Sequence, residues 1–175
     1  MTKTRYNLGL IFEPTWEERI VYFSQELDAG HQSSVRLAPK ASPHVTIVQF
    51  EASANEAREY WERVHTILPP SLLVSFAGLT LLPSSKEGTW VEISVYRTSA
   101  LASVQKQALA VLSPKVPLNK IGDFYRPHVT LARFADPSIP TLQLLPHDLL
   151  RAKDLRTYIA MGRLEGRFEI GSLRP

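Results

Sequence analysis

Apolar and polar residues alternate with two different periods along this chain, and the changes of period divide it into strands and helices. A short apolar run at residues 6–12 is followed by Pro14, which predicts a buried strand that leads into a helix. Residues 15–27 then carry apolar side chains at helical spacing, and Thr15 with Glu18 matches a T-x-x-E capping box. The chain therefore opens with a strand and a helix.

Further elements follow the same two periods. A second capping box, Ser53 with Glu56, precedes another helical stripe that two prolines end at residues 69 and 70. The other expected elements are strands at residues 72–82, 90–96, 157–164 and 167–173, and a helix at residues 99–112. The first two of these strands predict one hairpin and the last two another, which turns at Glu165 and Gly166. Residues 136–153 are rich in proline and predict a loop with one short helix.

A phrase of eight residues occurs in two similar copies, PHVTIVQF at 43–50 and PHVTLARF at 127–134. A shift of 84 residues relates the two copies, and the same shift carries most of the other expected strands and helices onto one another. We therefore predict a single domain over residues 1–175, built from two pseudo-repeats at about 5–82 and 89–166. A pseudo-two-fold axis between them brings the two copies of the phrase to one shared groove.

Composition limits the chemistry that this site can use. The chain has no cysteine, which excludes disulfides, thiolate metal sites and cysteine nucleophiles. With 20 basic and 17 acidic residues, it favours a local basic site over a surface that wraps nucleic acid. No apolar run approaches the length of a signal core or a membrane span, so we expect a soluble, cytoplasmic protein.

The repeated phrase carries a histidine and a threonine two residues apart. Side chains two apart in a strand project from one face, so His44 pairs with Thr46 and His128 with Thr130. Two imidazoles that face one gap suit phosphodiester cleavage, because one can take a proton from water while the other protonates the departing oxygen. The threonine hydroxyls would hold the nonbridging phosphoryl oxygens. The competing interpretation is a duplicated structural strand, and the matching places of the two copies weigh against it.

The other histidines, His31, His65 and His147, occur once each and are expected to be surface or structural residues. No third ligand stands at a recognisable spacing from either His-x-Thr pair, which disfavours a zinc site. Tyr125, just before the second copy, is a candidate for stacking on a base, and a core or rim role is an equal alternative.

Several cations lie near the two copies and are candidates for binding a phosphate. They are Arg36, Lys40, Lys120, Arg126 and Arg133. Arg133 comes three residues after Thr130, so strict alternation places it on the opposite strand face. Only a bulge or a position near the strand end would bring it to the phosphate, and a solvated cation is the equal alternative.

The paired motifs resemble the H-x-T/S motifs of the 2H phosphoesterase superfamily. RPHVTLARF is especially similar to its RNA 2′,3′-cyclic phosphodiesterase branch, also called 2′-5′ RNA ligases. The resemblance implies a bilobal α+β fold with two antiparallel sheets flanking a central cleft and helices outside. It also implies catalysis without a metal or another cofactor. By this resemblance His44, Thr46, His128 and Thr130 are catalytic, and Arg133 matches the arginine that often follows the second motif.

The resemblance implies hydrolysis of a 2′,3′-cyclic phosphate, on RNA ends or small nucleotides, to a 2′-phosphate. As a hypothesis, His128 is the general base and His44 the general acid. Arg133, Tyr125 and Arg126 are the candidate substrate-binding residues, and we expect a monomer without membrane or metal partners.

Other activities and a binding role stay open. The first motif ends in IVQF, not in the F-L-G common in the ligase branch. Cleavage of 2′-5′ linkages, trimming of RNA 3′ ends and ligation therefore remain alternatives. A noncatalytic module that binds RNA ends or nucleotides, and a purely structural protein, are alternatives of other classes.

Overall fold

The computed structural model describes residues 3–28, 33, 37, 41–84, 88–113, 117–135, 147–164 and 166–175. Its strands are β1 (Thr4–Phe12), β2 (His44–Ala52), β3 (Ser71–Val74), β4 (Phe76–Ser84), β5 (Gly88–Val95), β6 (His128–Phe134), β7 (Leu155–Arg163) and β8 (Arg167–Ser172). Its helices are α1 (Pro14–Asp28), α2 (Ala54–Ile67), α3 (Ser99–Leu112), the 3-10 turn η1 (Gly122–Phe124) and α4 (His147–Leu150).

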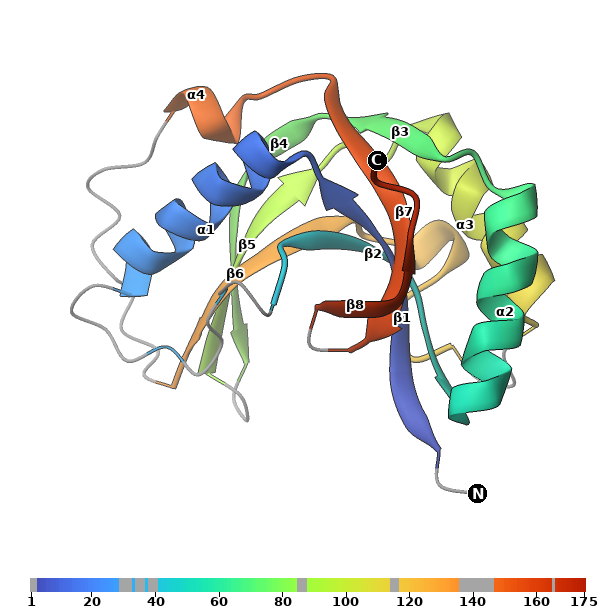
Figure 1. Ribbon diagram of the computed structural model, residues 1–175. Coiled ribbons are helices and arrows are strands. Elements are labelled where there is room, and N and C mark those ends of the chain that lie inside the picture. The colour runs from blue at the N-terminus through green and yellow to red at the C-terminus, as the bar shows by residue number, and fades with distance from the viewer. Residues whose placement is uncertain are drawn as a thin grey trace.

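The strands form two antiparallel sheets, and the predicted α+β class is confirmed. One sheet has five strands in the order β2-β1-β7-β3, with β8 paired to β7, and the other has three in the order β4-β5-β6. Figure 1 shows α1 on one flank of these sheets and α2 with α3 on the opposite flank. The side chains between helices and sheets form one continuous apolar core, with Phe12, Phe50, Phe76, Ile47 and Leu131 among its fully buried members.

The strand predicted at residues 72–82 is in fact two strands in two sheets. β3 pairs with β7, whereas β4 pairs with β5, and the chain crosses between the sheets at Ser75. The backbone at this point bonds outside the ladders: Phe76 N–H donates to the carbonyl of Ala152, and the carbonyl of Ser75 accepts from Tyr96 N–H. The β4–β5 hairpin itself agrees with the prediction.

The C-terminal hairpin, β7 with β8, was also expected from the sequence. Arg163 pairs with Arg167, so three residues separate the strands where two were predicted. Gly166 adopts a φ of 77°, a left-handed conformation that favours glycine at this turn.

The strand registers of the two sheets match one another, with an offset slightly different from the 84-residue shift of the motifs. Thr46 pairs with Gly9, and Thr130 pairs with Glu92, so the strands that support the motifs are offset by one residue less than the motifs themselves. The third strands are exchanged, because β4 of the first repeat pairs with β5 and β7 of the second pairs with β1. The two-repeat, single-domain organisation stays a prediction, and these matching registers support it.

The helices also cross between the two repeats. α1 packs on β6 as well as β1, and α3 packs on β2. The predicted Ser53–Glu56 capping box is present at the start of α2. The one predicted at Thr15 and Glu18 is wrong, since α1 begins at Pro14, whose missing N–H costs nothing in a first turn. Within the described residues, no helix combines the length and hydropathy needed to cross a bilayer.

Candidate active site

The two motif strands are edge strands that meet. β2 ends the five-stranded sheet, β6 ends the three-stranded sheet, and the two strands contact each other. On both, the histidine and the threonine are partly exposed while the valine between them is buried. We call the face that carries His44, Thr46, His128 and Thr130 the site face.

Each motif strand carries a β-bulge directly after its threonine. Thr46 pairs with Gly9 but Val48 pairs with Leu8, so Ile47 is the extra residue. In β6 the pairings of Thr130 and Ala132 show that Leu131 is extra in the same way. A bulge reverses the alternation that follows it, and the burial pattern accordingly has two consecutive buried residues before Arg133. Arg133 therefore lies on the site face, whereas strict alternation would place it on the opposite face.

Polar side chains from the opposite repeat, of which Ser24 and Gln105 are buried, hold both bulges. The hydroxyl of Ser24 in α1 donates to the carbonyl of Leu131 over 2.5 Å. The amides of Gln105 in α3 and of Asn119 donate to the carbonyl of Ile47 at 3.0 and 3.2 Å. A bulge leaves backbone groups outside the ladder, and a buried carbonyl without a donor is costly. The helices thus fix the strand geometry that aims the motif side chains.

Both imidazoles are held by the same backbone hydrogen bond. Nδ1 of His44 lies 2.9 Å from the carbonyl oxygen of Ser42, and Nδ1 of His128 lies 2.9 Å from that of Arg126. A carbonyl oxygen only accepts, so Nδ1 carries a proton in both rings and donates it. Nε2 is then the nitrogen of each ring that is available for proton transfer.

The surroundings of the two rings differ. The ring of His44 packs edge-on against Phe168 with centroids 5.2 Å apart. Burial lowers the pKa of His44 below its ordinary 6.5, the hydrogen bond to Ser42 opposes this, and the charge of His128 lowers it further.

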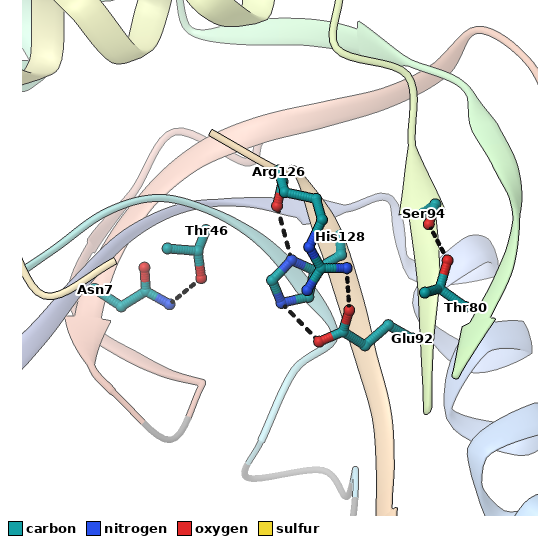
Figure 2. Close-up of polar contacts among 7 residues, drawn as sticks. All are labelled: Asn7, Thr46, Thr80, Glu92, Ser94, Arg126 and His128. Atoms are coloured by element: carbon teal, nitrogen blue, oxygen red, sulfur yellow. Dashed lines mark hydrogen bonds and ion pairs between the residues drawn. The ribbon is translucent and has the colours of Figure 1, made fainter. Parts of the chain in front are cut away.

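His128 faces a carboxylate that the sequence analysis did not identify as functional. Glu92 Oε1 lies 3.3 Å from His128 Nε2, and Glu92 Oε2 lies 2.6 Å from Nη1 of Arg126 (Figure 2). The Glu92 side chain is only 5% exposed. A charged residue within an alternating strand was the available signal, because a carboxylate is buried almost only when it is paired.

The two threonines have different neighbours as well. Nδ2 of Asn7 donates to Thr46 Oγ1 over 3.3 Å, and Figure 2 shows this pair on the strands beside His128. Asn7 is fully buried, and its Oδ1 has no hydrogen-bond partner in the described part of the chain. Because Thr46 Oγ1 accepts from Asn7, its hydroxyl hydrogen stays available for a ligand oxygen. Thr130 instead faces Glu92 across the ladder.

Tyr125 is placed for a structural role and not for stacking on a base. Its side chain is buried, with 5% of the residue exposed, and its hydroxyl donates to the backbone carbonyl of Thr46 over 2.8 Å. Burial raises the pKa of this hydroxyl above its ordinary value, so it remains a donor. The core alternative fits this geometry, and the ring has no exposed face for a base.

The remaining candidate cations and histidines are more scattered. The guanidinium of Arg133 lies over the ring of Trp90, 5.2 Å from its centroid, and Lys120 is exposed. Arg36, Lys40 and His31 lie outside the described residues. His65 lies in α2, with Nδ1 3.0 Å from the carbonyl of Trp61. His147 begins α4.

Metal-ligating side chains do not gather at this site. Across the residues that the structure describes, no three His, Asp or Glu side chains are grouped so that they could hold a metal ion. The polar groups present are imidazoles, hydroxyls, an amide and one carboxylate that is already bound by an arginine. This set can transfer protons and donate hydrogen bonds to an anion.

Comparison with known proteins identifies one family. The model of the 2'-5' RNA ligase superfamily matches residues 13–172. Among curated proteins, nothing matches. Escherichia coli LigT complexed with 3'-AMP superposes with a TM-score of 0.55 at 14% identity, covering 91% of this chain and 87% of that one.

Two further solved structures have a similar fold. LigT complexed with phosphate has a TM-score of 0.53 at 12% identity over 92% of this chain and 87% of that one. Kluyveromyces marxianus Usb1 has a TM-score of 0.53 at 14% identity over 94% of this chain and 93% of that one. At these identities the likeness concerns the fold alone.

Proposed function

The chain belongs to the 2'-5' RNA ligase superfamily, and from this premise we propose that it is a metal-independent phosphodiesterase that hydrolyses 2′,3′-cyclic phosphates to 2′-phosphates. Membership supports a phosphoesterase or RNA-processing role. The observation that carries the finer proposal is the pair of imidazoles on meeting edge strands, both with Nδ1 bound to a backbone carbonyl. The same backbone bond aims Nε2 of each ring for proton transfer.

In the proposed reaction, water attacks the phosphorus of the cyclic phosphate. One histidine takes a proton from the water at Nε2, a P–O bond forms, and the bond from phosphorus to O3′ breaks. The other histidine gives its Nε2 proton to O3′, which leaves a 2′-phosphomonoester and a free 3′-hydroxyl. After product release, the ring that took a proton loses it to solvent and the other ring regains one, so both return to their starting states with no net uptake of protons.

Thr46 and Thr130 are the proposed donors to the nonbridging phosphoryl oxygens, on which charge builds in the transition state. The hydrogen bond from Asn7 to Thr46 supports this role, because it leaves the hydroxyl hydrogen for the ligand. Arg133 and Arg126 are proposed to attract the substrate phosphates. The bulge on β6 supports the first of these, since it brings Arg133 to the site face.

RNA ends or small cyclic nucleotides are the proposed substrates, and we place the reaction in the cytoplasm. LigT, which shares the fold, was solved with 3'-AMP and with phosphate, and this supports a nucleotide phosphate as the ligand class. Cleavage of 2′-5′ linkages and trimming of RNA 3′ ends rest on the same four motif residues, so a substrate panel has to include them.

The test is turnover of a nucleoside 2′,3′-cyclic phosphate in the presence of EDTA, followed by ³¹P NMR. We expect the 2′-phosphomonoester to accumulate with the wild-type protein and not with the variant in which both His44 and His128 are replaced by alanine. Binding of the substrate without turnover would instead indicate a noncatalytic module. Formation of the 3′-phosphate would contradict the proposed leaving group.

A further inference from the structure

The two halves of the site have the same backbone but different partners at one register position. Thr46 faces Gly9 across the ladder, and Thr130 faces Glu92. A Cβ added to Gly9 would lie 3.5 Å from the ring of Phe168, the ring that also packs against His44. One histidine therefore has an aromatic ring where the other has a carboxylate.

Both ring nitrogens of His128 face oxygen acceptors. Nδ1 lies 2.9 Å from the carbonyl of Arg126, and Nε2 lies 3.3 Å from Oε1 of Glu92. The carboxylate of Glu92 is close enough to Nε2 to attract a protonated imidazole. Arg126 also contacts the carboxylate of Glu92, and the low exposure of Glu92 limits the screening of its charge by water.

His44 has one such acceptor, the carbonyl of Ser42, on the Nδ1 side. The ring of His44 also packs against the ring of Phe168, which carries no oxygen or nitrogen to accept a second proton. Burial, and then the charge of His128, lower the pKa of His44. At neutral pH this ring is neutral, with its lone pair on Nε2.

We propose that Glu92 is a positioning residue that keeps a proton on Nε2 of His128, so that His128 is the general acid and His44 the general base. This inference rests on the proposed phosphodiesterase function, and it reverses the order that was assumed from the sequence. Glu92 acts through His128 and does not itself touch the substrate.

Other charged groups near His128 come from several elements. Glu92 lies on β5, Arg126 precedes β6, and His44 lies on β2. Arg126 opposes a positive charge on His128, whereas Glu92 favours it and lies 3.3 Å from Nε2. The charge of His128 in turn disfavours protonation of His44. In this proposal a single carboxylate therefore influences the protonation state of both imidazoles.

The decisive variant is Glu92→Gln, which keeps the size and the acceptor toward Arg126 but removes the charge. In this variant the alkaline limb of the pH–rate profile moves to lower pH, because the general acid loses its proton more easily. We expect kcat/KM at pH 8 to fall about tenfold. The acidic limb, set by His44, has its midpoint below pH 6.5 and moves less. Glu92→Asp restores part of the alkaline limb.

A second readout does not depend on turnover. Imidazole ¹⁵N chemical shifts at pH 7 report the imidazolium fraction of His128, and we expect this fraction to fall in Glu92→Gln. Glu17→Gln is the matched control, since it removes another carboxylate bound by an arginine, Arg174, but lies in α1. It leaves the His128 signals and the pH–rate profile unchanged.

Two results would overturn the proposal. One is an unchanged His128 imidazolium fraction in a folded Glu92→Gln protein. The other is a shift of the acidic limb in place of the alkaline limb. If the wild-type protein turns over no cyclic phosphate, the proposed function fails, but the NMR comparison still tests whether Glu92 holds the proton of His128.

Discussion

The β1–β2 and β5–β6 strand pairs can be compared position by position. They share backbone features but differ in the side chains around the motifs. Both pairs have a bulge after the motif threonine and a histidine Nδ1 bound to the carbonyl two residues earlier. These features use the same backbone positions in both pairs. The side chains across the ladder differ, with Gly9 in one pair and Glu92 in the other. Backbone symmetry thus supplies two aimed imidazoles, and one substitution is enough to make them unequal.

The largest expected effect comes from removing either imidazole. His44→Ala and His128→Ala should each lower kcat by about 10²–10⁴-fold on a nucleoside 2′,3′-cyclic phosphate. A phosphodiester with a p-nitrophenyl leaving group needs no general acid, so His128→Ala should regain most of its rate on that substrate, while His44→Ala should not. Steady-state kinetics with both substrates measure this difference.

The outcome of that experiment decides whether the two halves differ in function. Equal rescue of the two variants would mean that the contacts of Glu92 and Phe168 do not assign the proton roles. Rescue of His44→Ala alone would restore the order first assumed from the sequence. Circular dichroism of both variants is the control for folding.

The two threonines are expected to behave alike although their neighbours differ. Thr46→Val and Thr130→Val each remove a hydroxyl donor and should lower kcat by about 10²–10³-fold, with a smaller change in KM. Asn7→Ala should reduce kcat less, because it frees the Thr46 hydroxyl without deleting it. A change confined to KM in the valine variants would contradict a role in the transition state.

The bulges themselves are testable through their side-chain donors. Ser24→Ala removes the hydroxyl that donates to the Leu131 carbonyl and should lower the free energy of unfolding by about 1–3 kcal/mol. Asn119→Ala removes one of two donors to the Ile47 carbonyl and also the acceptor of the Gln49 N–H, so it should lower the free energy of unfolding as well. Urea denaturation measures both losses, and unchanged stability in either variant would show that its side chain does not hold the bulge.

Long periodic stretches made much of the fold predictable. The helix expected at residues 99–112 is α3 at those bounds, because its apolar stripe is uninterrupted and its ends are marked. The split at Ser75 was not predictable, since apolar residues continue on both sides of it and the strand is interrupted by hydrogen bonds to Ala152, Tyr96 and Asp154. Such contacts join residues far apart in the sequence.

The site was predictable where a repeat marked it. His44, Thr46, His128 and Thr130 stand out because the phrase is duplicated, whereas the partners that make the halves different are by definition not duplicated. The bulges left a weak trace, the adjacent apolar residues after each threonine, but their cause lies in donors such as Ser24 on a distant helix. A single sequence does not show that pairing.

The smallest expected effect distinguishes the two roles considered for Tyr125. Tyr125→Phe keeps the ring and removes only the hydroxyl that donates to the Thr46 carbonyl. A residue that stacks on a base would tolerate this change, whereas a residue that positions Thr46 would not. We expect a few-fold lower kcat with an unchanged KM, and a loss of about 1 kcal/mol in the free energy of unfolding. Full activity in Tyr125→Phe would mean that the bond to Thr46 has no part in aiming its hydroxyl.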